Sequence, residues 1–206
     1  MIEINGVTKI YPGQKEAALR GVTLAIENGE FFGLLGPNGA GKTTMIKLLS
    51  TLLTPNEGEI IIDGERLQRS SAGVKRKLSM ITQEYSLRSN MTPEQIMELH
   101  GRLYQLPKTK IKERTESLLT FCGLDAHRKK ICRHLSGGMK RKLMLCRGLL
   151  TEPEILILDD AVSAVDTDTE EQILRNLHTL RAGKTNIIIA VSYTHLRAHE
   201  TSQDLV

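Results

Sequence analysis

The apolar positions of the chain gather in short continuous runs that are separated by polar and glycine-rich turns. Runs at Phe31–Leu35, Ile155–Leu158 and Asn186–Ala190 predict strands, and the run at Ile155–Leu158 predicts one that is buried in a parallel sheet. Met45–Leu49 and Thr169–Leu180 predict helices between these strands. Strands that alternate with helices are typical of an α/β fold.

Two further groups of elements interrupt this alternation. Residues 1–30 and Glu59–Ile62 predict short antiparallel strands. From 85 to 151 the pattern is helical, and Thr92-Pro93-Glu94 predicts a helix start in which threonine caps and proline takes the first position. We therefore predict an α/β core with an antiparallel β subdomain and an inserted helical subdomain.

A glycine-rich motif follows the first buried strand and opens the first core helix. Gly36, Gly41, Lys42 and Thr43 match the pattern G-x-x-x-x-G-K-[ST], and a chance match in this strand and helix context is improbable. Glycines allow backbone N–H groups to point inward around a triphosphate, and the helix dipole adds to the attraction. Lys42 would reach the β- and γ-phosphates, and the Thr43 hydroxyl would bind Mg²⁺. The predicted phosphate-binding residues are Gly36, Pro37, Asn38, Gly39, Ala40, Gly41, Lys42, Thr43 and Thr44.

A second motif, LSGGMKRKL, lies at Leu135–Leu143. Ser136 is a suitable N-cap for a basic helix, and two glycines leave the first amides uncovered. Taken alone, this motif is also compatible with an ordinary helix start.

Together the two motifs resemble those of the nucleotide-binding subunits of ATP-binding cassette (ABC) transporters, whose signature reads LSGGQ followed by basic residues. Met139 stands in this chain where the family has glutamine. The resemblance implies a P-loop NTPase core of the ABC ATPase type that binds ATP and Mg²⁺ and acts as a face-to-face pair. It also implies that Ser136, Gly137 and Gly138 grip the γ-phosphate of ATP held by the Lys42 loop of the partner subunit.

The resemblance assigns roles to further single residues. Tyr11 would stack on adenine, although a lone surface tyrosine remains the alternative. Gln83 would touch Mg²⁺ and signal to the helical subdomain, and Asp159 would hold Mg²⁺ through water. Asp166 would lie in the loop that crosses the dimer seam. The predicted metal residues are thus Thr43, Gln83 and Asp159.

The residue after Asp159 departs from the family pattern. Most hydrolytic members carry glutamate there, whereas this chain has Asp160, which is one methylene shorter. A general base contributes roughly 10²- to 10⁴-fold to a rate, so the site is predicted to bind ATP far better than it hydrolyses it. The predicted catalytic residues are Asp160, Gln83 and Lys42.

Two regions suggest a composite sequence. Residues 155–190 resemble one-chain exporters with paired unequal ATP sites. The residues before 155, with their stretch at 82–104, instead resemble the detached ATPase subunits of drug- or polymer-exporting transporters, which predicts a chimera joined near Ile155. The run VSYTHLRAHET at Val191–Thr201 resembles a translated sequencing adaptor, so His195 is not expected to be the switch histidine. The predicted divisions are an ABC ATPase domain at 1–190 with C-terminal elements missing, its core at 1–84 and 152–190, its helical subdomain at 85–151, and a non-native tail at 191–206.

Composition restricts the partners further. The formal charge is +4, but the basic clusters lack interleaved aromatic residues, so solvated faces are expected rather than nucleic-acid binding. The three cysteines have no CxxC spacing and are predicted to be reduced packing residues. No run reaches the roughly twenty apolar residues of a membrane helix. The basic clusters are Lys75–Lys77, Arg128–Lys130 and Lys140–Lys142, and the histidines expected on the surface are His100, His127, His134 and His178.

The expected protein is an ATP-hydrolysing subunit that powers an ABC exporter of the drug, lipid or polymer efflux class. Its expected partners are transmembrane subunits and a second nucleotide-binding subunit, so that it would lie in the cytoplasm against the inner face of the membrane without entering it. Two alternatives stay open: a nucleotide-binding module with negligible hydrolysis, and a non-functional truncated chimera. A soluble ABC protein that acts on ribosomes or DNA usually implies tandem cassettes or coiled-coil inserts, and the sequence shows neither.

Overall fold

The computed structural model describes residues 1–82, 84–159, 176–190 and 201–204. These residues divide into two units, each with buried apolar side chains of its own. The sheet unit contains 1–80, 154–159, 178–190 and 201–204, and the helical unit contains 81–82, 84–153 and 176–177.

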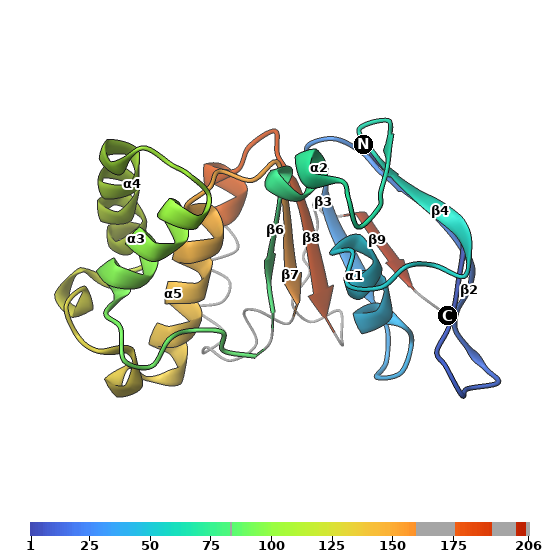
Figure 1. The fold of residues 1–206 in the computed structure, drawn as a ribbon, viewed down its shortest axis with the longest axis horizontal. Coiled ribbons are helices and arrows are strands. Elements are labelled where there is room, and N and C mark those ends of the chain that lie inside the picture. The colour runs from blue at the N-terminus through green and yellow to red at the C-terminus, as the bar shows by residue number, and fades with distance from the viewer. Residues whose placement is uncertain (83, 160–175, 191–200, 205–206) are drawn as a thin grey trace. The chain divides into compact units, whose positions relative to one another are not determined.

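A five-stranded sheet carries the predicted parallel strands (Figure 1). β3 pairs in parallel with β8, and β7 also pairs in parallel with β8. All five residues of β3 and the first four of β7 are buried, as expected for parallel strands that are covered on both faces. The three strands predicted from apolar runs are therefore confirmed. The order is β6-β7-β8-β3-β9, with β3 at Phe31–Leu35, β6 at Leu78–Ile81, β7 at Ile155–Asp159, β8 at Thr185–Ala190 and β9 at Thr201–Asp204.

The edge strand β9 was not predicted. Its backbone pairs in parallel with β3, from Phe32 opposite Thr201 to Leu35 opposite Asp204. These four residues belong to the segment predicted to be a non-native tail, while 191–200 and 205–206 lie outside the described residues. A backbone ladder can form with almost any sequence, so this pairing does not depend on an evolved origin of the tail.

A four-stranded antiparallel sheet completes the sheet unit and confirms the antiparallel strands predicted for the first part of the chain. Ile2 and Ile4 are buried on one face, whereas Asn5 is exposed. Asp63 and Gly64 join the last two strands with φ angles of 51° and 78°, as in a type I′ hairpin turn. The order is β2-β1-β4-β5, with β1 at Ile2–Ile10, β2 at Ala17–Ile26, β4 at Glu57–Ile62 and β5 at Glu65–Arg66.

Helix α1 (Lys42–Leu49) packs beside β2 and β7. It buries Met45, Ile46, Leu48 and Leu49 in one cluster with apolar residues of both sheets. The loop between β3 and α1 is therefore anchored at both of its ends by the core. A shorter helix, α2 (Ala72–Lys77), precedes β6.

Helices α3, α4 and α5 of the helical unit lie together in Figure 1. Thr92 caps the first of them as predicted: its hydroxyl accepts from the Gln95 N–H, and the Gln95 side chain accepts from the Thr92 N–H. Leu118, Leu119 and Leu124 are buried, which confirms their predicted place in a core. The helices are α3 (Pro93–Leu103), α4 (Lys108–Phe121) and α5 (Gly137–Leu149), with 3₁₀ turns η1 (Asp125–His127) and η2 (Cys132–His134) before α5.

The C-terminal end of α5 is held by α4. The guanidinium of Arg114 donates to the carbonyls of Leu149 and Leu150 at 2.7 and 2.8 Å, and it also pairs with Glu152. These bonds satisfy carbonyls that a helix end leaves without intrahelical donors. Within this unit, α5 is thus fixed at its last turn.

Two surface predictions were wrong. His100 is half-buried and packs against Tyr104, with 4.8 Å between the centroids of the two tilted rings. Arg141, from a cluster expected to be solvated, is only 4% exposed. In both cases the helix places the side chain on a face that other elements cover, which composition alone does not reveal.

Of the predicted helix at Thr169–Leu180, only 176–180 falls within the described residues, and it is helical there. None of the helices in the described ranges is long and apolar enough to cross a membrane.

Candidate nucleotide-binding site

The loop between β3 and α1 has a backbone that favours glycine at three points. Gly36, Gly39 and Gly41 have φ angles of 147°, 91° and 88°. Gly41 is also the N-cap of α1, where no side chain caps the helix and no acidic residue occupies the first turn. The first N–H groups of a helix have no intrahelical acceptor, and the helix dipole attracts anions there. The start of α1 is therefore a suitable anion site.

Lys42 folds back over this loop. Its side chain is buried, and its ammonium donates to the Gly36 carbonyl and, at 2.9 Å, to the Pro37 carbonyl. The sequence thus supplies a cation within the turn that its glycines form. A charged donor at that place strengthens the binding of phosphate oxygens.

Gly41 also lies against strand β2. A Cβ at this position would come within 2.5 Å of the Ala18 carbonyl oxygen and 2.6 Å of a Leu19 methyl group. At Gly39 a Cβ would meet nothing within 4 Å. The close approach fixes the last residue of the loop against the antiparallel sheet.

Tyr11 lies beside the start of α1. Its hydroxyl is 3.1 Å from the hydroxyl oxygen of Thr44, which is buried, whereas Thr43 is exposed. The structure thus brings the tyrosine predicted to contact adenine close to the predicted phosphate loop. An exposed Thr43 hydroxyl is free of the core and compatible with a role toward a metal ion.

Asp159 ends β7 at the same edge of the sheet. In the register of the parallel strands, Asp159 and Leu34 both flank Ile189 of β8. Two strand spacings separate their backbones by about 10 Å. The carboxylate therefore follows one strand of the sheet while the phosphate loop follows another, as expected for a ligand site at the carboxyl ends of parallel strands.

The predicted signature residues lie in the helical unit. Ser136 is the N-cap of α5, and its hydroxyl accepts from the Met139 N–H at 3.2 Å, which confirms the predicted capping. Ser136 and Gly137 are exposed, and Gly138 is half-buried. Their backbone amides open the first turn of a helix without acidic residues, which suits an anion.

Three predicted site residues lie outside the described residues, namely Gln83, Asp160 and Asp166. The sheet unit therefore brings together Tyr11, the Gly36–Thr44 loop and Asp159, and the helical unit presents Ser136, Gly137 and Gly138.

The donor set of the sheet unit fits a nucleoside triphosphate with Mg²⁺. The uncapped helix start and the Lys42 ammonium supply donors for phosphate oxygens. Thr43 and Asp159 supply oxygen ligands, which Mg²⁺ prefers.

Strongly shifted pKa values occur elsewhere in the structure. Burial lowers the pKa of Arg181 to about 10, and burial together with the charge of Arg147 lowers the pKa of His100 to about 4. Neither residue belongs to the predicted site.

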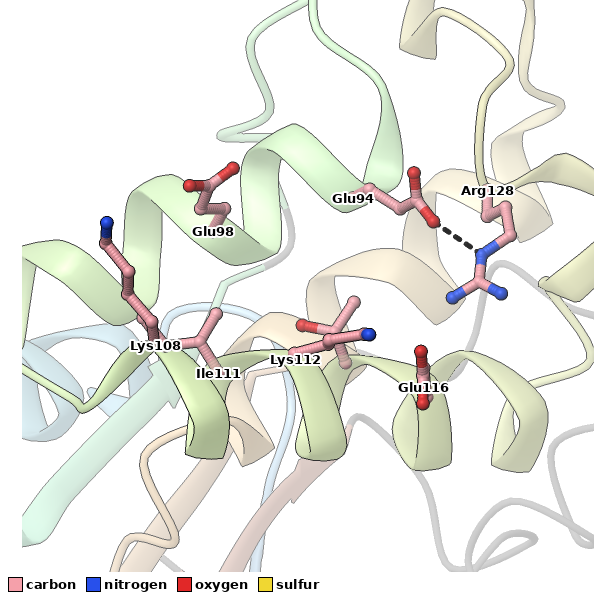
Figure 2. A pocket seen from close by; sticks show the side chains of 8 residues that line it. Glu94, Glu98, Lys108, Ile111, Lys112, Glu116 and Arg128 are labelled. Atoms are coloured by element: carbon pink, nitrogen blue, oxygen red, sulfur yellow. Dashed lines mark ion pairs between the residues drawn. The ribbon is translucent and has the colours of Figure 1, made fainter.

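A cavity of about 280 Å³ lies between α3 and α4 in the helical unit. Figure 2 shows Glu94 and Arg128 facing each other at one end, where they form an ion pair of 2.6 Å. No residue predicted to bind the nucleotide lines this cavity, so it is a separate feature. Its lining is Glu94, Glu98, Lys108, Ile111, Lys112, Thr115, Glu116 and Arg128.

Sequence reasoning missed three residues next to the signature. Arg141 donates to the Thr82 carbonyl at 2.8 Å, Arg147 binds Ser86, and the Tyr85 hydroxyl lies 3.3 Å from the Gly137 carbonyl oxygen. Each contact joins positions more than fifty residues apart in the chain, and no local pattern encodes such pairs.

Comparison with known proteins agrees with this geometry. The sequence matches the family described as ABC transporter over residues 19–163. The methionine import ATP-binding protein MetN of Caulobacter vibrioides is 39% identical over 178 residues, covering 84% of this chain and 54% of the relative. The daunorubicin resistance ATP-binding protein DrrA3 of Streptomyces coeruleorubidus is 35% identical, covering 93% of this chain and 60% of the relative. The chain thus spans a little more than half the length of these relatives.

Solved structures agree as well. The dimeric bacterial ABC transporter cassette MJ0796 matches with a TM-score of 0.85 and 25% identity, covering 100% of this chain and 95% of that chain. A post-hydrolysis dimer of the same cassette, bound to ADP and Pi, matches with a TM-score of 0.83 and 27% identity, covering 93% of this chain and 88% of that chain. The chain therefore belongs to the ABC transporter family and has the P-loop fold of its ATP-binding cassette.

Proposed function

We propose that this chain binds ATP at the Gly36–Thr44 loop and uses it to power a membrane transporter. The observation that carries the proposal is the uncapped start of α1, with the Lys42 ammonium folded over the loop that precedes it. Tyr11 would stack on the adenine from its place beside Thr44. Binding of this kind depends on positioning and electrostatics rather than on covalent chemistry.

Thr43, Gln83 and Asp159 would hold Mg²⁺, which when bound neutralises charge on the β- and γ-phosphate oxygens. Asp160 would orient and deprotonate the attacking water. Its shorter side chain supports slow turnover relative to tight binding.

Two cassettes would complete each site. Ser136, Gly137 and Gly138 of one subunit would bind the γ-phosphate of ATP held by Lys42 of the other, and Asp166 would contribute to the seam between them. The dimeric MJ0796 cassette supports this proposal. These residues would have the same roles in a homodimer and in a heterodimer.

Transmembrane subunits would bind the cassette at the inner face of the cell membrane. We further propose that the transporter exports a substrate of the drug, lipid or polymer class, and the similarity to the daunorubicin resistance protein DrrA3 supports this direction. The MetN relatives, named for methionine import, favour import as the second candidate. Transport assays with the cognate membrane subunits in inverted vesicles distinguish the two, because only export accumulates substrate inside them.

The direct test of nucleotide binding is Lys42→Ala. Loss of its charged hydrogen bonds to phosphate should cost about 1.5–3 kcal/mol, which weakens MgATP affinity roughly 10- to 100-fold. Lys47→Ala is the matched control, since Lys47 is an exposed lysine of the same helix and should bind MgATP within about twofold of the unaltered chain. Equal affinities for all three proteins, measured by isothermal titration calorimetry, would refute the proposal.

Hydrolysis is tested separately, by single-turnover kinetics of the chain and of Asp160→Glu. Because the glutamate side chain is one methylene longer, Asp160→Glu should hydrolyse ATP faster than the unaltered chain, by up to about 10²-fold. Binding with no measurable hydrolysis in the unaltered chain would instead favour the nucleotide-binding module.

The tail and the join near Ile155 stay part of the proposal. The match of VSYTHLRAHET to a translated adaptor supports an artificial origin of 191–206. Resequencing of the source locus through both places tests it, and uninterrupted genomic reads across either one would refute the corresponding claim.

A further inference from the structure

The cavity between α3 and α4 follows one face of α4. Its α4 residues are spaced by three and four positions, which places them on a single side of the helix. Glu94 and Glu98, one turn apart on α3, line the opposite wall, and Arg128 meets Glu94 at one end (Figure 2). All of the lining belongs to the helical unit. The residues from α4 are Lys108, Ile111, Lys112, Thr115 and Glu116.

Backbone contacts hold the walls of this cavity in place. A Cβ on Gly101 of α3 would lie 2.6 Å from Cγ1 of Ile111, so the two helices pack there without a side chain on the α3 position. At the start of α3 the Glu94 N–H donates to the Arg128 carbonyl at 3.3 Å, and the two side chains form their ion pair. The cavity is therefore preformed, as most small-molecule sites are.

One polar side chain of the lining has no hydrogen-bond partner. Thr115 is only 6% exposed, and its hydroxyl is buried without a hydrogen bond to any residue that the structure describes. Burial of an unpaired hydroxyl costs free energy, and buried polar groups in folded proteins nearly always have a partner. Because Thr115 lines the cavity, a molecule bound inside it can supply the missing partner.

Arg128 offers further donors to the same space. Its Nε lies 2.6 Å from a carboxylate oxygen of Glu94, but this ion pair does not have the geometry of a hydrogen bond. Figure 2 shows the two terminal nitrogens on the side of the guanidinium that faces α4, and the Lys112 ammonium extends toward that end of the cavity. A guanidinium with two terminal N–H groups available is the preferred partner of a carboxylate, which it binds through two parallel hydrogen bonds.

The charges of the lining favour an anion. Two of its three carboxylates are already paired, Glu94 with Arg128 and Glu98 with Arg102. The two ammonium groups and one carboxylate that remain give a net charge of +1. At about 280 Å³ the cavity lies just below the usual range for drug-sized ligands, so it suits a smaller molecule. The lining residues without an ion pair to another described residue are Lys108, Lys112 and Glu116.

We propose that this cavity binds a small organic carboxylate, at a site separate from the nucleotide site. The carboxylate accepts hydrogen bonds from the Arg128 guanidinium and the Thr115 hydroxyl, with the charge of Lys112 nearby, and its carbon chain lies against Ile111. Glu116 contacts the ammonium group if the ligand is an amino acid, and stays in solvent if it is a simple carboxylic acid. The proposal needs neither ATP nor a second subunit.

Two-dimensional ¹H–¹⁵N NMR of the full chain tests the site with three matched probes: butyrate, 2-aminobutyrate and butyramide. Butyrate should shift the signals of residues 111–116 and 128 with a Kd of about 1 mM or tighter. Butyramide has the same shape without the charge and should bind at least about tenfold more weakly, because charged acceptors form the stronger hydrogen bonds. Tighter binding of 2-aminobutyrate than of butyrate identifies an amino acid, and weaker or equal binding identifies a simple carboxylic acid.

Thr115→Val removes the unpartnered hydroxyl and keeps the shape of the side chain. It should weaken butyrate binding about tenfold or more, because a hydrogen bond to a charged group is lost, while the fold is preserved. Thr115→Ser keeps the hydroxyl and should bind butyrate within about threefold of the unaltered chain. Thr109→Val is the matched control, since Thr109 is an exposed threonine of the same helix outside the lining.

Four results would overturn the proposal: no shifts at 111–116 and 128 with butyrate or 2-aminobutyrate at 10 mM, shifts confined to other residues, equal affinities for butyrate and butyramide, or an unchanged affinity in Thr115→Val. Should Thr115→Val lose its fold, Lys112→Met decides. Lys112 is exposed, so its substitution leaves the fold intact and should weaken butyrate binding severalfold. Unchanged affinity in Lys112→Met would then overturn the proposal.

Discussion

Alanine at Gly41 should destabilise the chain more than alanine at Gly39, although the two glycines have almost the same backbone angle. Their φ values are 88° and 91°, so both substitutions place a side chain in the left-handed region. That conformation costs an L-residue roughly 1–2 kcal/mol. The two sites differ in their surroundings. A comparison of Gly39→Ala with Gly41→Ala therefore separates the cost of backbone strain from the cost of steric overlap.

The overlap at Gly41 can be estimated from the structure. A Cβ there would lie 2.5 Å from the Ala18 carbonyl oxygen and 2.6 Å from Leu19 Cδ2, whereas Gly39 has open space within 4 Å. Relief of the contact with a backbone atom requires a shift of the loop or of β2 by nearly 1 Å, an overpacking that costs about 1–3 kcal/mol. We therefore expect a loss of about 1–2 kcal/mol for Gly39→Ala and of about 2–5 kcal/mol for Gly41→Ala.

Urea unfolding without nucleotide, followed by far-UV circular dichroism, measures this difference at constant m-value. Exclusion of nucleotide removes any contact between the new methyl group and a phosphate. The reasoning fails if the two variants lose the same stability within about 0.5 kcal/mol, because the close approach of Gly41 to β2 would then carry no energetic weight. As a second readout, the shifted loop of Gly41→Ala should weaken MgATP binding about tenfold or more.

Three further predictions concern positions outside the predicted site. Thr115→Val should raise the free energy of unfolding by about 1 kcal/mol, because the Thr115 hydroxyl is buried without a hydrogen-bond partner among the described residues; a loss of stability in urea titrations would contradict this. The hydrogen bond from Lys77 holds the pKa of Asp63 below its ordinary 3.8. The Asp63 carboxylate therefore stabilises the folded chain fully above its pKa in the unfolded chain, and this stabilisation disappears as pH falls through its pKa in the folded chain. Asp63→Asn should therefore cost no more than about 1 kcal/mol at pH 7 and less at each step from pH 5 to pH 3, and a pH-independent difference would refute the assignment. All three cysteines are buried, and burial raises the pKa of Cys146, so the native chain should react slowly with a thiol reagent at pH 8 and quickly in urea.

The features that the sequence predicted well are encoded by neighbouring residues. The loop that ends at Gly41 needs only its own glycines and the strand and helix on either side. The capping of α3 by Thr92 depends on Gln95, three residues away. Asp159 could be placed at the edge of the parallel sheet because an apolar run ends just before it. In each case the relevant contacts span only a few residues, and pattern alone determines them.

Other features depend on residues far apart in the chain. Arg141 belongs to a basic run that resembles a solvated helix face, yet it is buried because it donates to a carbonyl 59 residues earlier. Arg181 is also buried, and besides its neighbours Thr185 and Asn186 its guanidinium donates to the carbonyl of Glu154, 27 residues earlier. Residue type alone predicts that these arginines are charged, but it does not predict which carbonyl groups accept their hydrogen bonds.

The same distinction between local and long-range contacts predicts how substitutions should act. Changes in the loop from Gly36 to Thr44 alter groups that would touch the phosphates, so their first effect should be on nucleotide affinity. Substitution of Arg141 leaves that loop untouched, so its effect should appear in the helix that begins at the signature glycines while the affinity of a single cassette for MgATP stays the same. Arg141→Lys keeps the charge but loses the planar fork that reaches the Thr82 carbonyl, so it should bind MgATP as the unaltered chain does, unlike Lys42→Ala. A tenfold fall in the affinity of the monomer for MgATP in Arg141→Lys would show that the Arg141 contact and the phosphate loop do not act independently.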